Sequence, residues 1–226
     1  MNAKPLAVDA TPQQLNEAEK RLLEAALALF SEKGYEATSI REIIESAGVT
    51  RPVLYYYFVN KEDLYTRLVQ TTFTEIGADF ESALAAAKSG RDRLKALVIQ
   101  AFEHAEHSPQ AIRLILQVFF SPPGQGPRLD KDALWAMRFT PIVTAVRESV
   151  EQGEMLAGDP ETLALSLCGV MDMHIMCKAN RPATKLSREL AEALVDLFLS
   201  GATNPFEQST RLASPFEWSK IEPKST

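Results

Sequence analysis

Apolar residues recur every three to four positions along most of the chain, the spacing that places them on one face of an α-helix. Alternating polar and apolar runs of the kind that half-buried strands show are absent between the turn signals. The predicted helices span residues 14–33, 39–46, 51–58, 61–87, 91–107, 109–120, 128–152, 159–180 and 187–200. The pattern therefore predicts an all-α protein.

Local signals indicate where the first helices begin and end. Gly34 ends the first helix, and Gly48 ends the second. Ser39 with Glu42 three residues later is a capping box, which satisfies free backbone groups at a helix N-terminus. Residues 13–60 thus predict three helices, with a turn of a few residues between the second and third. Helix-turn-helix domains have this layout, and so do other small three-helix bundles.

Composition and breaks in the pattern divide the chain into four stretches. We expect a flexible arm over 1–12, the three-helix domain over 13–60, a larger helical domain over 61–200 and a tail over 201–226. The tail is rich in Pro, Ser and Thr, and its three large aromatic residues can either dock on the helical body or belong to a disordered segment. These residues are Phe206, Phe216 and Trp218.

The short helix that follows Gly48 contains Leu-Tyr-Tyr-Tyr-Phe at 54–58. Successive residues on a helix are about 100° apart, so three consecutive tyrosines cover an arc too wide for one buried face. Leu54 and Phe58 lie four positions apart and predict the buried face. At least one tyrosine must then point outward, toward a partner.

Bulk properties exclude some classes of protein. The chain has 226 residues, 46% of them hydrophobic, and a net charge of −6, which argues against a surface coated for non-specific nucleic-acid binding but allows a small basic footprint. No run approaches the roughly 18 apolar residues of a membrane span. The N-terminal residues contain no apolar segment typical of a secretory signal. We expect a cytoplasmic protein without a membrane partner.

Signals for catalysis or metal binding are incomplete. His104-Ala105-Glu106 matches only part of a zinc deaminase signature, which also needs Pro-Cys-x-x-Cys. His104 and His107 with their neighbouring glutamates would need further ligands to hold a metal. No phosphate-binding loop or nucleophile elbow is present. We therefore expect no enzymatic activity, no cofactor and no metal.

With these elements in place, residues 38–69 resemble the DNA-binding region of tetracycline-repressor-type (TetR-type) transcriptional regulators. The resemblance rests on the capped second helix, the turn Ala47-Gly48-Val49, the aromatic run 54–58 and the segment Asn-Lys-Glu-Asp-Leu at 60–64. Pro52 departs from the glycine that many members have. The resemblance implies a ligand-responsive regulator that acts as a repressor on a palindromic operator in double-stranded DNA.

The resemblance and the helix-turn-helix layout together imply which residues meet DNA. The first turn of the third helix enters the major groove, where Arg51 can contact guanine and Val53 a thymine methyl. The neighbouring cations, hydroxyls and phenols suit phosphates; for Tyr55 and Tyr57 a plain core role stays open. The predicted DNA contacts are Thr38, Ser39, Arg41, Thr50, Arg51, Pro52, Val53, Tyr55, Tyr57 and Lys61.

The resemblance also implies an effector cavity and a homodimer. The effector is expected to be a small apolar or aromatic molecule, held by Phe102, Gln117, Phe119, Phe120, Trp135, Phe139, Met171 and His174. The last two helices are expected to pair with their copies through Leu163, Leu167, Val170, Leu190, Leu194, Leu197 and Phe198.

Three other hypotheses remain. The chain could be a helical enzyme, a metal-binding sensor, or an interaction module that has lost DNA binding. Turnover, bound-metal analysis and a mobility-shift assay with the DNA upstream of its own gene would separate them from a regulator.

Overall fold

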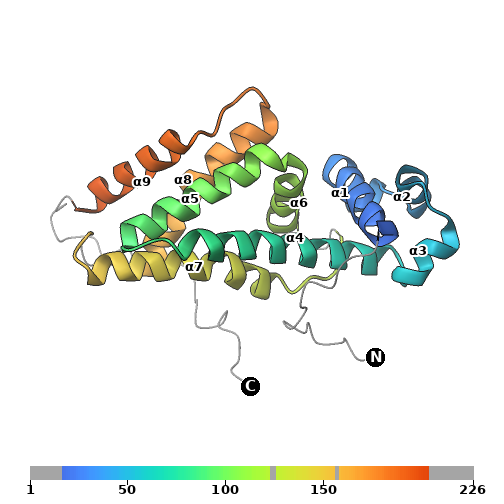
Figure 1. Cartoon of the computed structure of the whole chain (residues 1–226), viewed down its shortest axis with the longest axis horizontal. Coiled ribbons are helices and arrows are strands. Elements are labelled where there is room, and N and C mark those ends of the chain that lie inside the picture. Colours follow the sequence, from blue (N-terminus) through green and yellow to red (C-terminus); the bar gives the residue numbers. More distant parts are fainter. Residues whose placement is uncertain (1–16, 123–125, 156–157, 204–226) are drawn as a thin grey trace, which may run out of the picture. The chain divides into compact units, whose positions relative to one another are not determined.

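The computed structural model describes residues 17–122, 126–155 and 158–203, and these ranges contain helices and no strand (Figure 1). The all-α prediction is confirmed. The helices are α1 (Glu17–Ala37), α2 (Ile40–Ala47), α3 (Arg51–Tyr57), α4 (Lys61–Leu84), α5 (Gly90–His107), α6 (Pro109–Phe120), α7 (Lys131–Glu151), α8 (Pro160–Asn180) and α9 (Arg188–Thr203). The arm predicted over 1–12 and the tail residues Phe206, Phe216 and Trp218 lie outside the described residues.

The contacts divide the chain into two compact units, the first ending at Leu68 and the second beginning at Val69. The sequence placed this boundary eight residues earlier, after residue 60. The difference arises because Leu64 and Leu68 of α4 are buried with the first unit. A single continuous helix, α4, therefore contributes residues to both units.

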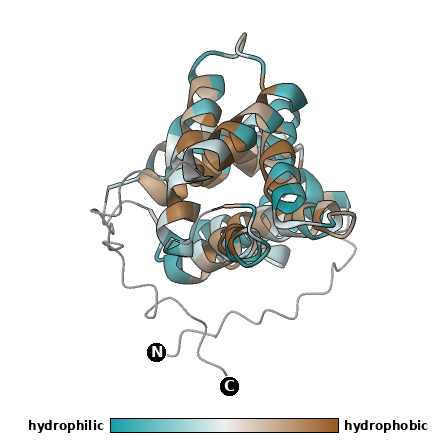
Figure 2. Cartoon of the chain, turned by 90° about the vertical axis from the view of Figure 1, so that its left-hand side faces the viewer, coloured by the Kyte–Doolittle hydropathy of each residue, from teal (hydrophilic) through white to brown (hydrophobic). Residues whose placement is uncertain are grey.

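The first unit is a small bundle in which α1 packs against α2 and α3. Its core includes five apolar side chains that are at most 1% exposed: Leu22, Phe30, Ile43, Leu54 and Phe58. The apolar spacing in the sequence is thus the spacing of the residues that fill this core. The helices that face the viewer in Figure 2 belong to the second unit, and they carry the same mixture of apolar and hydrophilic residues.

The start of α2 is fixed by the predicted capping box. The Ser39 hydroxyl accepts from the Glu42 backbone N–H at 3.3 Å, and the Glu42 carboxylate accepts from the Ser39 N–H at 2.8 Å. Lys33 Nζ donates to the same carboxylate at 2.8 Å. The pKa of Glu42 is lowered to about 2, first by the hydrogen bond from Lys33 and then by those from Ser39.

Gly48 ends α2 in the left-handed conformation, with φ 61° and ψ 39°. Its N–H donates to the Glu45 carbonyl, and Val49 N–H donates to the Ile44 carbonyl. These bonds satisfy carbonyls that the end of the helix would otherwise leave free. The turn then delivers the chain to α3 within three residues.

The second unit is built around α5, which packs against α6, α7, α8 and α9. At its first residue, Gly90, a Cβ atom would lie only 2.2 Å from Ser149 Oγ and 2.5 Å from Ser149 N. The Gly90 N–H donates to Gln152 Oε1 at 3.1 Å. Absence of a side chain at residue 90 therefore lets α5 begin against the end of α7.

Among the described helices, α8 alone is long and apolar enough to cross a membrane by length and composition, with a mean hydropathy of 1.2. A core helix of a globular protein passes the same test, and α8 packs against α5, α6, α7 and α9. Its apolar character is accounted for in part by this packing.

Replacing Gly48 by alanine is expected to lower the free energy of unfolding by about 1–2 kcal/mol, because a Cβ atom is strained in the left-handed conformation. Gly77→Ala is the control: Gly77 lies inside α4, and a Cβ there meets no atom within 4 Å. It should raise stability by about 0.5–1 kcal/mol. Urea denaturation measures both, and equal effects of the two substitutions would contradict the assignment of the turn.

Candidate functional site

The N-terminal turn of α3 is exposed while the opposite face of the same helix is buried. Leu54 is 0% exposed and Phe58, the residue that directly follows the helix, is 1% exposed; α3 packs against α1 and α2. Thr50, Arg51 and Pro52 are exposed. The structure thus holds out the turn that the sequence assigned to the major groove, with Thr50 at the N-cap position.

The tyrosines of α3 differ in exposure. Tyr56 is 80% exposed and Tyr55 46%, whereas Tyr57 is half-buried. The guanidinium of Arg51 lies over the Tyr55 ring, 5.7 Å from its centroid, and the Tyr56 and Tyr57 rings meet edge to face at 4.8 Å. Residues two positions apart on a helix point about 200° apart, so Tyr56 points away from the buried Leu54. The sequence-based list of DNA contacts did not include Tyr56.

Two predicted phosphate contacts have roles inside the first unit. Thr38 is 1% exposed, and its hydroxyl donates to the Gly34 carbonyl at 2.8 Å. Ser39 is exposed but engaged in the capping box. The structure therefore accounts for both hydroxyls without DNA, and Thr38 is too deeply buried for its side chain to reach a phosphate.

Lys61, another predicted phosphate contact, also binds inside the first unit. Its Nζ donates to the Tyr35 carbonyl at 2.8 Å and to the Thr38 carbonyl at 2.9 Å. It lies 4.1 Å from the centroid of the Tyr35 ring, and Tyr35 contacts Tyr65 edge to face at 5.1 Å. These contacts attach the first turn of α4 to the end of α1.

The remaining predicted DNA contacts are accessible to varying degrees. Arg41 is exposed, and its Nε lies 2.7 Å from Glu45 Oε1 in an ion pair along α2. Val53 is half-buried beside the exposed turn. The exposed candidates that share α3 and its cap are therefore Thr50, Arg51, Pro52 and Tyr55.

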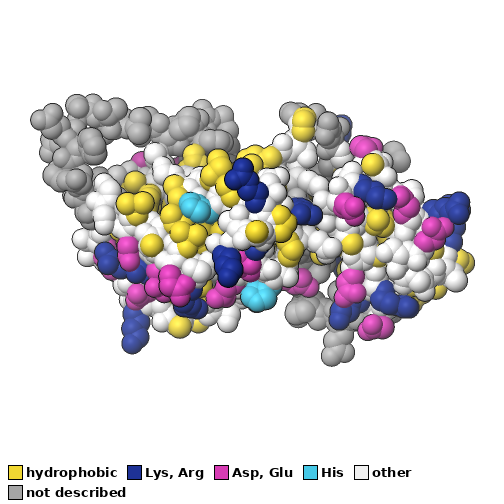
Figure 3. All heavy atoms as spheres, turned by 90° about the horizontal axis from the view of Figure 1, so that it is seen from above, with side chains coloured by type: hydrophobic (Ala, Val, Ile, Leu, Met, Phe, Trp, Pro, Cys, Tyr) yellow, Lys and Arg dark blue, Asp and Glu magenta, His cyan; other side chains and the backbone are white. Residues whose placement is uncertain are grey.

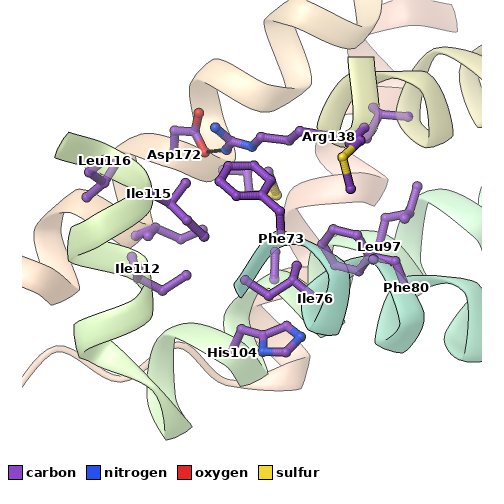
Figure 4. Close-up of a pocket in the computed structure, with 16 residues that line it drawn as sticks. Phe73, Ile76, Phe80, Leu97, His104, Ile112, Ile115, Leu116, Arg138 and Asp172 are labelled. Atoms are coloured by element: carbon purple, nitrogen blue, oxygen red, sulfur yellow. Dashed lines mark hydrogen bonds and ion pairs between the residues drawn. The ribbon is translucent and has the colours of Figure 1, made fainter. Parts of the chain in front are cut away.

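The second unit contains a cavity of about 60 Å³. One water molecule needs roughly 10–15 Å³ on such a measure, so the cavity admits a small molecule. Figure 4 shows Ile112, Ile115 and Leu116 of α6 on one side and Ile76 and Phe80 of α4 on the other. Further lining residues are Phe73, Gly77, Leu97, Ala101, His104, Met137, Arg138, Ile142, Met171, Asp172 and Ile175.

Three ionisable residues line this otherwise apolar cavity. Arg138 Nη2 donates to Asp172 Oδ1, and both side chains are 13% exposed. Burial raises the pKa of Asp172 despite the neighbouring guanidinium. His104 Nε2 lies 3.2 Å from Asp79 Oδ2, and burial lowers the pKa of this imidazole. The neutral imidazole is therefore favoured.

Of the residues predicted to line an effector cavity, Met171 alone is among those that line this one. Phe102 is 1% exposed in the core, Phe120 is 60% exposed, and His174 Nδ1 lies 2.8 Å from the Val170 carbonyl. The other aromatic residues form a chain of ring contacts that starts at the lining residue Phe73 and runs through Phe119, Trp135 and Phe139. Gln117 does not line the cavity.

The apolar residues predicted for a dimer interface divide into two groups. Leu167 is 2% exposed and belongs to the core of the second unit. Val170 on α8 and Leu197 on α9 are 43% and 70% exposed. Leu163, Leu190, Leu194 and Phe198 are half-buried. Met173 and Met176 of α8, which the prediction omitted from the interface, are also exposed.

Figure 3 shows hydrophobic side chains gathered on the upper face of the second unit, where α8 and α9 lie in Figure 1. We call the exposed residues Val170, Met173, Met176 and Leu197 the α8–α9 face. The described ranges contain no group of three or more His, Cys, Asp or Glu that could hold a metal. His104 and His107 therefore gain no third ligand from those ranges.

These features define a class of protein: a helix-turn-helix unit in which the first turn of the third helix is exposed, followed by a helical unit that contains a cavity. Residues 22–68 match the family described as bacterial regulatory proteins, tetR family. The resemblance stated from the sequence is confirmed over these residues, which lie in the helix-turn-helix unit.

Curated relatives match the N-terminal part of the chain. The transcriptional activator FasR of Mycolicibacterium smegmatis is 36% identical over 102 residues, which are 45% of this chain and 47% of that protein. The transcriptional repressor KstR2 of Mycobacterium tuberculosis is 31% identical over 100 residues, 44% of this chain and 50% of that protein. The chain thus spans about half the length of these relatives.

Solved structures match most of the fold. The fatty acid degradation regulator FadR of Bacillus halodurans has a TM-score of 0.70 and 20% identity, covering 80% of this chain and 98% of that one. FadR of Bacillus subtilis, solved in complex with stearoyl-CoA, has a TM-score of 0.69 and 18% identity, and it also covers 80% of this chain and 98% of that one. At these identities the likeness shows the fold alone.

Replacing Lys61 by methionine is expected to lower the free energy of unfolding by about 1.5 kcal/mol, because its two charged hydrogen bonds to backbone carbonyls are lost. Arg67→Met is the control, since it removes an exposed positive charge from the same helix. Thermal and urea denaturation provide the measurement. Unchanged stability together with weaker DNA binding would instead identify Lys61 as a phosphate contact.

Proposed function

We propose that this protein is a ligand-responsive transcriptional regulator that represses by binding a palindromic operator as a homodimer. The observation that carries the proposal is the exposed N-terminal turn of α3, anchored from behind by Leu54 and Phe58. The match of residues 22–68 to the tetR family supports it. The proposed compartment is the cytoplasm, where operator DNA is accessible.

In the proposed complex the first turn of α3 enters the major groove. Arg51 is the residue best suited to read a base, because its exposed guanidinium can donate two hydrogen bonds to guanine O6 and N7. Pro52 lacks a backbone N–H, so it offers this turn an apolar surface only. Val53 is half-buried next to it and is proposed to meet a thymine methyl group.

The phenols of α3 are proposed to meet the phosphates that flank the groove. A tyrosine hydroxyl can donate to a phosphate oxygen while its ring packs on the protein. Tyr55 supports Arg51 through its ring, and Tyr56 adds the most exposed phenol of the helix. Tyr57 and Arg41 remain candidates for the edge of this footprint. No phosphate role is proposed for Thr38 or Lys61, whose polar groups are engaged inside the first unit.

The cavity is proposed to bind a small effector that releases the operator. Phe73, Ile76 and Phe80 line the cavity from α4, and the same helix contributes Leu64 and Tyr65 to the first unit. Binding that favours one position of α4 can therefore shift the population of operator-binding conformations. The shift can be no larger than the effector's preference between the two conformations.

The homodimer is proposed to form through the α8–α9 face, because a monomer would leave Val170, Met173, Met176 and Leu197 in water. A two-fold dimer presents two copies of α3, which matches the symmetry of a palindromic operator. The partly exposed Leu163, Leu190, Leu194 and Phe198 are proposed to extend the interface. The choice of this face rests on the exposure of its apolar side chains.

Arg51→Ala is expected to weaken binding to the operator about tenfold or more and to reduce discrimination against single-base changes, because a bidentate contact to a base contributes roughly 1–3 kcal/mol. Mobility-shift titration with DNA from upstream of the gene gives both quantities. Arg147→Ala removes an exposed arginine from α7 and should leave binding unchanged. No binding by the parent protein to any upstream fragment would refute the proposed function and favour an interaction module.

Leu197→Glu is expected to convert the dimer to monomers, because it places a charge on the proposed apolar interface. Sedimentation velocity at micromolar concentration measures the assembly state. Phe120→Glu is the matched control, since Phe120 is a large apolar residue of α6 that is 60% exposed. Dissociation by the control variant but not by Leu197→Glu would place the interface elsewhere.

A further inference from the structure

The polar groups in the wall of the cavity indicate which chemical class of effector it binds. This inference rests on the proposed function. The walls of the cavity are apolar except for Arg138, Asp172 and His104. Figure 4 shows Arg138 and Asp172 together along one side of the cavity and His104 at the opposite end. An effector that fills the apolar space must therefore match the hydrogen-bonding groups at these two positions.

Arg138 has an unused hydrogen-bond donor. Its Nη2 donates to Asp172, but its Nη1 is buried and has no hydrogen-bond partner among the described residues. The guanidinium carbon lies 5.6 Å and 5.8 Å from the ring centroids of Phe119 and Phe139, so its surroundings are apolar. A buried donor without an acceptor carries a desolvation penalty, which an acceptor brought by a ligand would relieve.

His104 offers less to a ligand. Its Nε2 is also buried without a hydrogen bond of good geometry. Asp79 Oδ2 lies only 3.2 Å away, however, and a small rotation of either side chain would let it accept a hydrogen bond from this nitrogen. The imidazole also meets the Phe80 ring edge to face. Arg138 is therefore the anchor for a polar group on the effector.

The charge balance decides which kind of acceptor fits. Arg138 and Asp172 form a pair with no net charge in an apolar cavity. A carboxylate on the effector would add a second negative charge beside Asp172, and an uncompensated buried charge is strongly unfavourable. An uncharged carbonyl oxygen accepts the Nη1 hydrogen bond without disturbing this balance.

We propose that the effector is an apolar molecule with an uncharged carbonyl group, such as a ketone or ester, whose oxygen accepts a hydrogen bond from Arg138 Nη1. The apolar body of the effector lies against Phe73, Ile76 and Phe80 of α4 and the isoleucines of α6. Arg138 keeps its bond to Asp172 and orients the carbonyl. The cavity thereby distinguishes polar from non-polar ligands of the same shape.

Three small probes of similar size test the proposal on the full-length protein by titration calorimetry. Acetophenone has the carbonyl, ethylbenzene replaces it by a methylene group, and benzoate replaces it by a carboxylate. We expect acetophenone to bind about tenfold tighter than ethylbenzene, because only acetophenone can accept a hydrogen bond from the charged guanidinium. Benzoate is expected to bind more weakly than acetophenone.

The variant R138M/D172L removes the donor and its counter-ion together, which avoids an unpaired buried charge. We expect it to bind acetophenone and ethylbenzene equally well. R147M on α7 is the matched control and should keep the preference for acetophenone. A thermal melt verifies that each variant is folded.

The outcomes separate this inference from the proposed function. Equal binding of acetophenone and ethylbenzene by the parent protein, no binding of any probe, or a preference that survives in a folded R138M/D172L variant would overturn the carbonyl assignment. Tighter binding of benzoate would overturn it in favour of an anionic effector. Operator binding, measured without any probe, remains intact in these cases if the proposed function holds and is absent if the proposed function fails.

Discussion

Burial of two side chains, Leu54 and Phe58, is the interaction on which the proposed DNA-reading turn depends. A helix of seven residues is too short to be stable by itself in water, because helix nucleation is unfavourable. Burying a leucine or phenylalanine contributes roughly 1.5–3 kcal/mol each, enough to stabilise α3 against α1 and α2. The exposed side of α3 is consequently free to carry Arg51, Tyr55 and Tyr56 without a packing role.

Local chemistry made the first unit predictable from the sequence. The capping box at Ser39, the left-handed glycine at 48 and the anchors in α3 each act within a few residues, so a single sequence displays them. Lys61 could not be assigned this way, because its acceptors are carbonyls more than twenty residues earlier. Tyr56 was omitted although helical periodicity alone turns it away from the buried face.

The second unit was predictable in its helices but not in its cavity. The aromatic residues selected from the sequence mostly pack on one another, whereas α4 contributes lining residues although none of its residues was predicted to line a cavity. Leu167 shows the same limit: α8 is apolar around most of its circumference, so periodicity does not distinguish its core face from its exposed face. The sequence did contain a signal for the position of the cavity. Arg138 and Asp172 are single charged residues among apolar neighbours on α7 and α8, and both line the cavity.

The continuity of α4 restricts how such a protein can change over generations. Leu64 and Leu68 serve one core, and Phe73, Ile76 and Phe80 serve the other, with an unbroken helix between them. One residue gained or lost between Leu68 and Phe73 would rotate the second set by about 100° against the first. Side chains in either set can change with the proposed operator or effector, whereas an insertion or deletion inside α4 changes the rotation between the two sets by about 100° for each residue.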